Sequence, residues 1–268
     1  MASELDRAVK RQLDGILGEA PDAQRLAMAL RLLAKWRAQV LETALVERSG
    51  ERVLSGPFAG MAYPVRSSEG SRNARLIGAY EASLVPVIEE IVAGGYDRVV
   101  DVGCAEGYYA VGLALRMPGV RVIARDTDPK AQALCRRMAE ANGVAGRVEI
   151  GGVVTAAELG ALVSGRTVIL CDTEGAEEVL LDPVAGPGIL GADVLVEVHE
   201  GMKAGRIDLL TRRFAPSHEV RRFDRTLEAG GLPGWTEGLG DLDRLLLLWE
   251  WRASPTPWLW MRRREARA

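Results

Sequence analysis

The stretch at residues 98–114, RVVDVGCAEGYYAVGLA, constrains the fold of this chain more than any other part of the sequence. It begins with a short β-branched run of the kind that fills a buried parallel strand. Gly103 and Gly107 then bracket a tight turn, and residues 108–114 have the composition of a helix. A strand, a glycine turn and a helix in this order predict a doubly wound α/β fold, in which the N–H groups at the helix start face a bound ligand.

The register of the glycines narrows the kind of ligand. The run Asp101-x-Gly103-x-Ala105-x-Gly107 departs from the dinucleotide fingerprint G-x-G-x-x-G, because no glycine lies three residues beyond a G-x-G. The run resembles D-x-G-x-G-x-G, the first motif of the class I S-adenosylmethionine (AdoMet) methyltransferases, with Ala105 in place of the middle glycine. The resemblance implies a cofactor-binding turn formed by Asp101, Gly103, Cys104, Ala105, Gly107 and Tyr108.

The length and the net charge limit the classes of protein to which this chain can belong. A chain of 268 residues accommodates one large α/β domain and an appendage. Its net charge of −3 gives no general attraction to nucleic acid or to an anionic membrane, and no apolar run approaches the ~20 residues of a membrane span. The first residues do not predict a signal peptide, and the three cysteines have no C-x-x-C spacing, which favours reduced thiols. We therefore expect a cytoplasmic protein.

The N-terminal quarter predicts an appendage. Residues 24–46 place leucines at helical spacing and favour a helical cap on the domain, with a dimerisation helix, and hence a homodimer, as the alternative. Turn-forming residues dominate positions 49–75, but Phe58, Met61 and Tyr63 argue against disorder there. We expect a helical cap and a lid or substrate loop over residues 1–75, and an AdoMet-binding domain over residues 76–268.

The rest of the chain alternates strands and helices, which predicts parallel βαβ units. With the resemblance, this pattern predicts a doubly wound, mostly parallel sheet of seven strands whose last strand pairs antiparallel at the edge. Further strands are expected at residues 120–124, 147–150, 167–171, 194–198 and, for the last, 243–251.

The loops after the second and third predicted strands are expected to lie beside the cofactor. Asp126 stands 19 residues beyond Gly107, where an acidic residue grips ribose hydroxyls, and Thr127 adjoins it. Asp128 is the alternative, although it could instead cap the helix that follows. After the third strand, Gly152 and Val153 are expected to border the adenine.

The fourth and fifth strands lead into more specific motifs. Asp172-Thr-Glu-Gly-Ala-Glu and Glu197-Val-His199, in this order, resemble the FkbM-type branch of the class I methyltransferases. We expect His199, Asp172 and Glu174 to act on the methyl acceptor, with His199 as the first choice of base. His199 could equally serve only as a hydrogen-bonding partner. Asp172 could also contact the cofactor, as could Tyr80 and Glu81 before the first strand.

The sequence thus predicts an AdoMet-dependent methyltransferase that releases S-adenosylhomocysteine (SAH) and acts on a hydroxyl of a small molecule, such as a sugar or other natural product. A methyltransferase acting on RNA or protein is the alternative, and the acidic balance disfavours nucleic acid. A nicotinamide-dependent oxidoreductase or a silent nucleotide binder is disfavoured by the glycine register. No metal is expected, although Asp172, Glu174 and His199 could hold Mg²⁺.

Overall fold

A computed structural model describes residues 3–18, 22–68, 70–226, 231–252 and 254–264. Its centre is a seven-stranded sheet in the order β3-β2-β1-β4-β5-β7-β6, in which β7 runs antiparallel to both of its neighbours. The strands are β1 (Arg98–Val102), β2 (Arg121–Arg125), β3 (Val148–Gly151), β4 (Thr167–Cys171), β5 (Asp193–Glu197), β6 (His218–Phe223) and β7 (Trp258–Arg263). The first five strands pair in parallel, which confirms the expected doubly wound, mostly parallel sheet.

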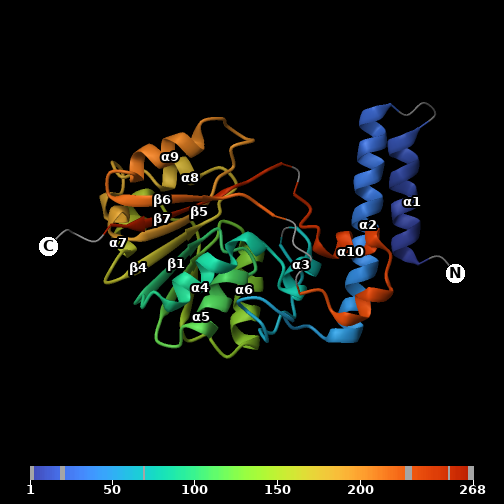
Figure 1. Cartoon of the computed structure of the whole chain (residues 1–268), viewed down its shortest axis with the longest axis horizontal. Helices are drawn as coiled ribbons and strands as arrows, with labels where there is room; N and C mark the ends of the chain where they lie inside the picture. The colour runs from blue at the N-terminus through green and yellow to red at the C-terminus, as the bar shows by residue number, and fades with distance from the viewer. Residues whose placement is uncertain (1–2, 19–21, 69, 227–230, 253, 265–268) are drawn as a thin grey trace.

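Helices cover both faces of the sheet (Figure 1). On one face, α4 (Val85–Ala93), α5 (Tyr108–Arg116) and α6 (Pro129–Ala141) contribute to one apolar cluster. On the other face, α7 (Ala156–Leu162), α8 (Glu177–Leu180) and α9 (Arg206–Phe214) contribute to a second cluster. Short 3₁₀ turns lie at Ala82–Leu84, Pro187–Gly191 and Gly234–Gly238. The winding direction reverses between β1 and β4, so the carboxyl ends of these two strands border the topological switch point.

The switch point explains why Gly103 is a glycine. Its φ of 81° lies in the left-handed region that side chains rarely adopt. A Cβ built there would lie 1.5 Å from the backbone oxygen of Asp172, at the end of the neighbouring strand β4. Gly103 therefore allows the carboxyl ends of β1 and β4 to approach each other.

The last strand was predicted in the wrong place. Residues 243–251 do not form a strand, because Asp241–Leu248 is helix α10, whose first turn carries acidic residues. Its Leu246, Leu247 and Leu248 are buried where α10 packs against α2 (Ala23–Ser49) and α3 (Arg72–Ile77), which accounts for an apolar run that resembles a strand. The antiparallel strand is β7, whose Trp258 to Met261 are all buried because β7 lies inside the sheet. The edge position belongs to β6.

The N-terminal helices form a hairpin of α1 (Glu4–Leu17) and α2 (Ala23–Ser49), with α3 (Arg72–Ile77) between it and the sheet (Figure 1) and α10 packed against α2 and α3. The C-terminal half of α2 packs through Leu41 and Leu45, which are buried. The other half exposes Leu26 and Leu30 at 54% and 71%. The homodimer therefore stays a prediction. The domain boundary expected after residue 75 falls inside α3.

The segment between α2 and α3 is ordered around core side chains. Phe58, Met61 and Tyr63 are buried, and the ring of Phe58 lies 5.2 Å from that of Tyr108 on α5. These aromatic residues therefore anchor the segment to the core. Its role as a lid or substrate loop stays a prediction. Within the described residues, no helix is long and apolar enough to cross a membrane.

Candidate active site

A cavity of about 630 Å³ lies at the carboxyl ends of the central strands. This volume falls within the range of small-molecule and cofactor sites. Residues from the ends of β1, β2, β3 and β4 form one part of its wall, and α2 and the segment after α10 form another. Of the predicted site residues, the cavity wall includes Tyr80, Gly103, Ala105, Asp126, Thr127, Gly152, Val153, Asp172 and Glu174.

The glycine turn is tied to the end of β2 by a carboxylate. Asp126 accepts a hydrogen bond from the backbone N–H of Ala105 and another from that of Asp128, each at 2.8 Å. Ala105 adopts a φ of 47°, a left-handed conformation that costs an alanine about 1 kcal/mol. Asp128 instead accepts from the N–H of Lys130 and caps α6. Both acids line the cavity, but only Asp126 also bonds to the glycine turn.

Asp101, Cys104 and Tyr108 lie beneath the turn and line a smaller cavity of about 30 Å³ next to the large one. Asp101 is 4% exposed, and its Oδ2 has no hydrogen-bond partner. Burial, with a contribution from the Asp126 carboxylate, raises the pKa of Asp101 to about 7. A buried carboxylate with an unsatisfied oxygen is costly, and a ligand donor could offset that cost.

Glu106, which the sequence analysis did not single out, is fully buried behind the turn. It accepts hydrogen bonds from the Tyr63 hydroxyl at 2.5 Å and the Ser68 N–H at 2.9 Å, and pairs with Arg75 at 3.0 Å. The segment before α3 is thereby fastened to the glycine turn. The signal was an acidic residue between Ala105 and Gly107, at a position that the motif leaves open.

A second group that the sequence analysis missed is the arginine after α10. Arg252 pairs with Glu81, Glu197 and Glu250 and lines the cavity. Glu81 is buried and also accepts a hydrogen bond from the Tyr109 hydroxyl. It is not part of the wall of the large cavity. Burial, and then the charge of Glu197, raise the pKa of Glu81 to about 8. The incorrect strand prediction over residues 243–251 concealed Glu250 and its neighbour Arg252 from the sequence analysis.

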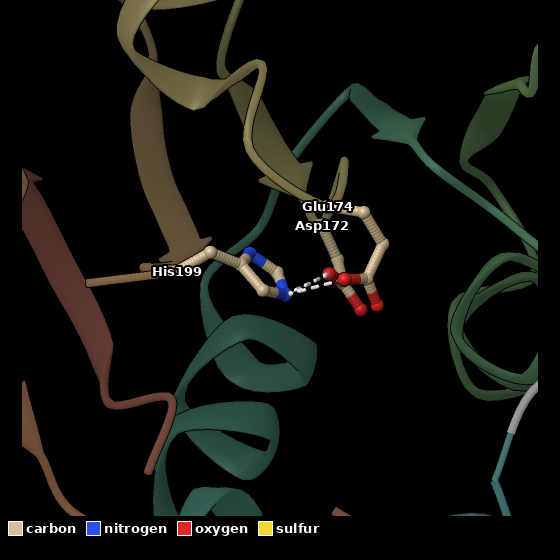
Figure 2. Close-up of side chains that lie close together, drawn as sticks. All are labelled: Asp172, Glu174 and His199. Carbon is tan, nitrogen blue, oxygen red and sulfur yellow. Dashed lines mark ion pairs between the residues drawn. The ribbon is translucent and has the colours of Figure 1, made fainter. Parts of the chain in front are cut away.

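The structure brings His199, Asp172 and Glu174 together, as Figure 2 shows. The imidazole Nδ1 lies 2.7 Å from Oε1 of Glu177, a fully buried carboxylate. Its Nε2 lies 3.2 Å from Glu174 and 3.9 Å from Asp172, while Glu197 is 3.8 Å away. One imidazole therefore has four carboxylates around it.

These carboxylates determine the charge of the cluster. Burial opposes the imidazolium, but the hydrogen bond to Glu177 and the nearby acids outweigh it and raise the pKa of His199 above 6.5. Burial, with the charge of Glu197, raises the pKa of Asp172 well above 3.8. His199 is 4% exposed and does not line the cavity, whereas Asp172 does. A base role for His199 stays a prediction, and the geometry favours Asp172 for direct contact with a substrate.

The same three side chains offer ligand atoms that lie within 4.8 Å of one another. Because Glu177 engages Nδ1, the Nε2 lone pair of a neutral His199 would face Asp172 and Glu174, an arrangement typical of metal-binding histidines. Two carboxylates also suit Mg²⁺. The residues could thus hold a divalent cation, and this alternative stays open.

Strained backbone also concentrates at this site. Among the described residues, Glu81, Ala105, Glu174 and Trp251 are the non-glycine residues with positive φ. Three of them line the cavity, and Glu81 is bonded to its wall residue Arg252. Such conformations cost about 1–3 kcal/mol each and cluster at functional sites.

Comparisons with known proteins give partial likenesses. No family model matches the chain. A curated protein, the release factor glutamine methyltransferase of Chlorobaculum tepidum, is 40% identical over 73 residues, which are 25% of this chain and 25% of that protein. The chain therefore aligns with about a quarter of the length of this curated relative.

Among solved structures, the O-methyltransferase of Bacillus cereus in complex with SAH gives a TM-score of 0.45 at 12% identity, covering 96% of this chain and 97% of that one. The human methyltransferase 10 domain containing protein gives a TM-score of 0.48 at 10% identity, covering 85% and 96%. At these values the fold assignment rests on the strand order itself.

Proposed function

We propose that this chain is an AdoMet-dependent methyltransferase that transfers a methyl group to a hydroxyl of a small molecule. The observation that carries the proposal is the hydrogen bond from the left-handed Ala105 N–H to Asp126, at the wall of a cavity above the switch point. This arrangement fixes the acidic side chain that follows β2 against the glycine turn that follows β1, where a nucleoside ribose and its linked chain would lie side by side.

The residues present fit AdoMet at its ribose, its adenine and its ammonium group. Asp126 would hold the ribose hydroxyls, and the exposed Val153 with Gly152 would border the adenine. Asp101, with its unpartnered oxygen beneath the turn, would accept from the ammonium of the methionine portion. When bound, AdoMet supplies an electrophilic methyl group on a sulfonium.

The acceptor side is assigned to Asp172. Its position on the cavity wall allows contact with an acceptor hydroxyl, and a carboxylate within hydrogen-bond reach can take the proton of that hydroxyl. His199, held by Glu177 and with its pKa raised by the surrounding carboxylates, would position Asp172 and Glu174. Most of the acceleration would come from alignment of the acceptor oxygen with the methyl carbon.

Within the class, we assign the chain to the FkbM-type branch on its Asp172-Thr-Glu-Gly-Ala-Glu and Glu197-Val-His199 runs. The partial likeness to a glutamine methyltransferase keeps protein methylation as the second candidate. That candidate lacks the N-P-P-Y-like run of many amino-group methyltransferases, since Asp182-Pro183 is followed by Val184. We also propose a cytoplasmic location, because the free cysteines Cys104, Cys135 and Cys171 are all buried.

A thermal-shift panel tests the cofactor assignment. AdoMet and SAH should raise the melting temperature of the protein, because a ligand that binds only the folded state stabilises it. NAD and NADP should leave it unchanged. A shift with NAD alone would replace the proposal by a nicotinamide-dependent activity.

A further inference from the structure

We propose that Arg31 and Lys35 of helix α2 bind an anionic group, a carboxylate or a phosphate, on the methyl acceptor. The inference rests on the proposed function, which it extends from a small hydroxyl compound to an anionic one. Both side chains line the large cavity and stand one helical turn apart on the same face of α2. The N-terminal hairpin thus contributes to the site as well as covering the domain.

Arg31 and Lys35 differ from the other cations on the cavity wall in their ion pairing. Arg75 is paired with a buried glutamate, Arg125 with Glu149, and Arg252 with three glutamates. Among the described residues, no carboxylate pairs with Arg31 or Lys35. Their positive charge is therefore available to a ligand.

The surroundings of Arg31 and Lys35 are shaped by Trp251. Arg31 donates to the backbone oxygen of Trp251, and the Lys35 ammonium lies 4.9 Å from the Trp251 ring centroid. Trp251 itself has a φ of 67°, and its indole nitrogen is buried without a hydrogen-bond partner. Strain and an unsatisfied donor at a cavity wall are the expected marks of a binding surface. Beside an apolar ring, the attraction between these cations and an anion is less screened than in water.

An anionic group of the acceptor fits this wall better than the cofactor carboxylate does. The residues proposed for the cofactor lie at the strand ends, whereas α2 lies beyond α3 from the sheet (Figure 1). Arg75, stacked 3.9 Å from the Tyr80 ring centroid, belongs to α3 and shares the small cavity with the glycine turn. Arg75 thus lies beside the glycine turn with its charge engaged by Glu106, whereas Arg31 and Lys35 lie on α2 and have no carboxylate partner among the described residues.

Matched probes test the proposal by calorimetry on the full chain saturated with SAH. The sugar series is glucose, glucuronate and glucose 6-phosphate, and the aromatic pair is 4-hydroxybenzyl alcohol and 4-hydroxybenzoate. In at least one series, an anionic member should bind at least tenfold more tightly than its neutral partner. The carboxylate and phosphate arms identify which anion is preferred.

Variants then locate the contact. Lys35→Gln and the Arg31→Gln/Lys35→Gln pair should remove the tenfold preference for the anion, and Lys35→Arg should keep it. Arg25→Gln, an exposed change on the same helix, serves as the matched control and should change nothing. The affinity of each variant for SAH should stay within a few-fold of that of the parent. A rise in the melting temperature of each variant on addition of SAH confirms that the variant is folded.

Three results would overturn the proposal. The anionic probes could bind no better than the neutral ones, or the preference could survive the double substitution. A tenfold loss of SAH affinity in the double variant would assign the two cations to the cofactor. Failure of the parent protein to bind SAH at all is a different outcome, because it removes the proposed function itself.

Discussion

Replacing Asp101 by asparagine should make the ligand-free protein more stable, and increasingly so as the pH rises. Asp101 is buried, and its pKa is raised from 3.8 to about 7. The folded state therefore holds a proton that the unfolded state releases between these values. A raised carboxyl pKa means that stability is lost as the pH rises from about 4 through 7, the reverse of the usual salt-bridged aspartate.

The difference of about 3 pKa units, at about 1.4 kcal/mol each, corresponds to a cost of up to about 4 kcal/mol above pH 7. An asparagine side chain cannot ionise, so the variant escapes this cost. An asparagine amide without a partner would cost about 1–3 kcal/mol, but that penalty does not vary with pH. The difference in unfolding free energy between variant and parent should thus rise with pH, even if its absolute value is offset.

Urea unfolding of Asp101→Asn and the parent at pH 4.5, 6 and 8 measures this difference. Asp208→Asn, an exposed change on α9, provides the control and should show no trend. A difference that stays flat between pH 4.5 and 8 would refute the assignment of a buried, proton-holding carboxyl. SAH should meanwhile bind the variant more weakly than the parent, because the proposed ammonium contact is lost.

Four further outcomes follow from the site. Ala105→Gly should stabilise the protein by about 0.5–1 kcal/mol in urea unfolding, since the left-handed φ suits glycine, and a loss of stability would contradict the strain. His199→Gln should cost more stability at pH 6 than at pH 9. The raised pKa of His199 means that its ion pairs are fully present below about 6.5 and are lost as the pH rises through the pKa of the folded state. Equal losses of stability at the two pH values would speak against a charged imidazole. Asp172→Asn should lower turnover by about 10²–10⁴ with SAH affinity within a few-fold, and unchanged turnover would remove Asp172 as the base. Methyl transfer should persist in EDTA, and a loss that Mg²⁺ restores would assign the Asp172 cluster to a cation.

The parallel part of the fold was predictable because most of its strands carry a short run of apolar, often β-branched residues next to a turn signal. Residues 98–102, 167–171 and 193–197 form strands close to where the sequence placed them. The C-terminal part of the fold was not predictable, because the run from Leu245 to Leu248 is apolar enough for either a strand or a helix buried on one face. Tertiary packing against α2 decides in favour of the helix.

The placement of site residues was predictable where a turn or the end of a neighbouring strand determines it, as for His199, Asp172 and Glu174. Gly103 and Asp126 could be placed because a tight turn and its partner strand leave few choices. Arg252 and Glu106 could not, because their partners Glu81 and Arg75 lie 171 and 31 residues away in the sequence. Long-range ion pairs have no local pattern. The raised pKa of His199 also depends on carboxylates from other parts of the chain, which its own strand does not reveal.

The central claim is that the glycine turn and Asp126 form an AdoMet site, and calorimetric titration of SAH tests it most directly. The parent should bind with micromolar affinity, and Asp126→Ala should weaken binding at least tenfold, because a charge-assisted hydrogen bond is worth about 1.5–3 kcal/mol. Asp128→Ala is the matched control, since Asp128 caps α6 and does not bond to the turn. Unchanged affinity in Asp126→Ala, or a parent that binds no SAH, would contradict the account.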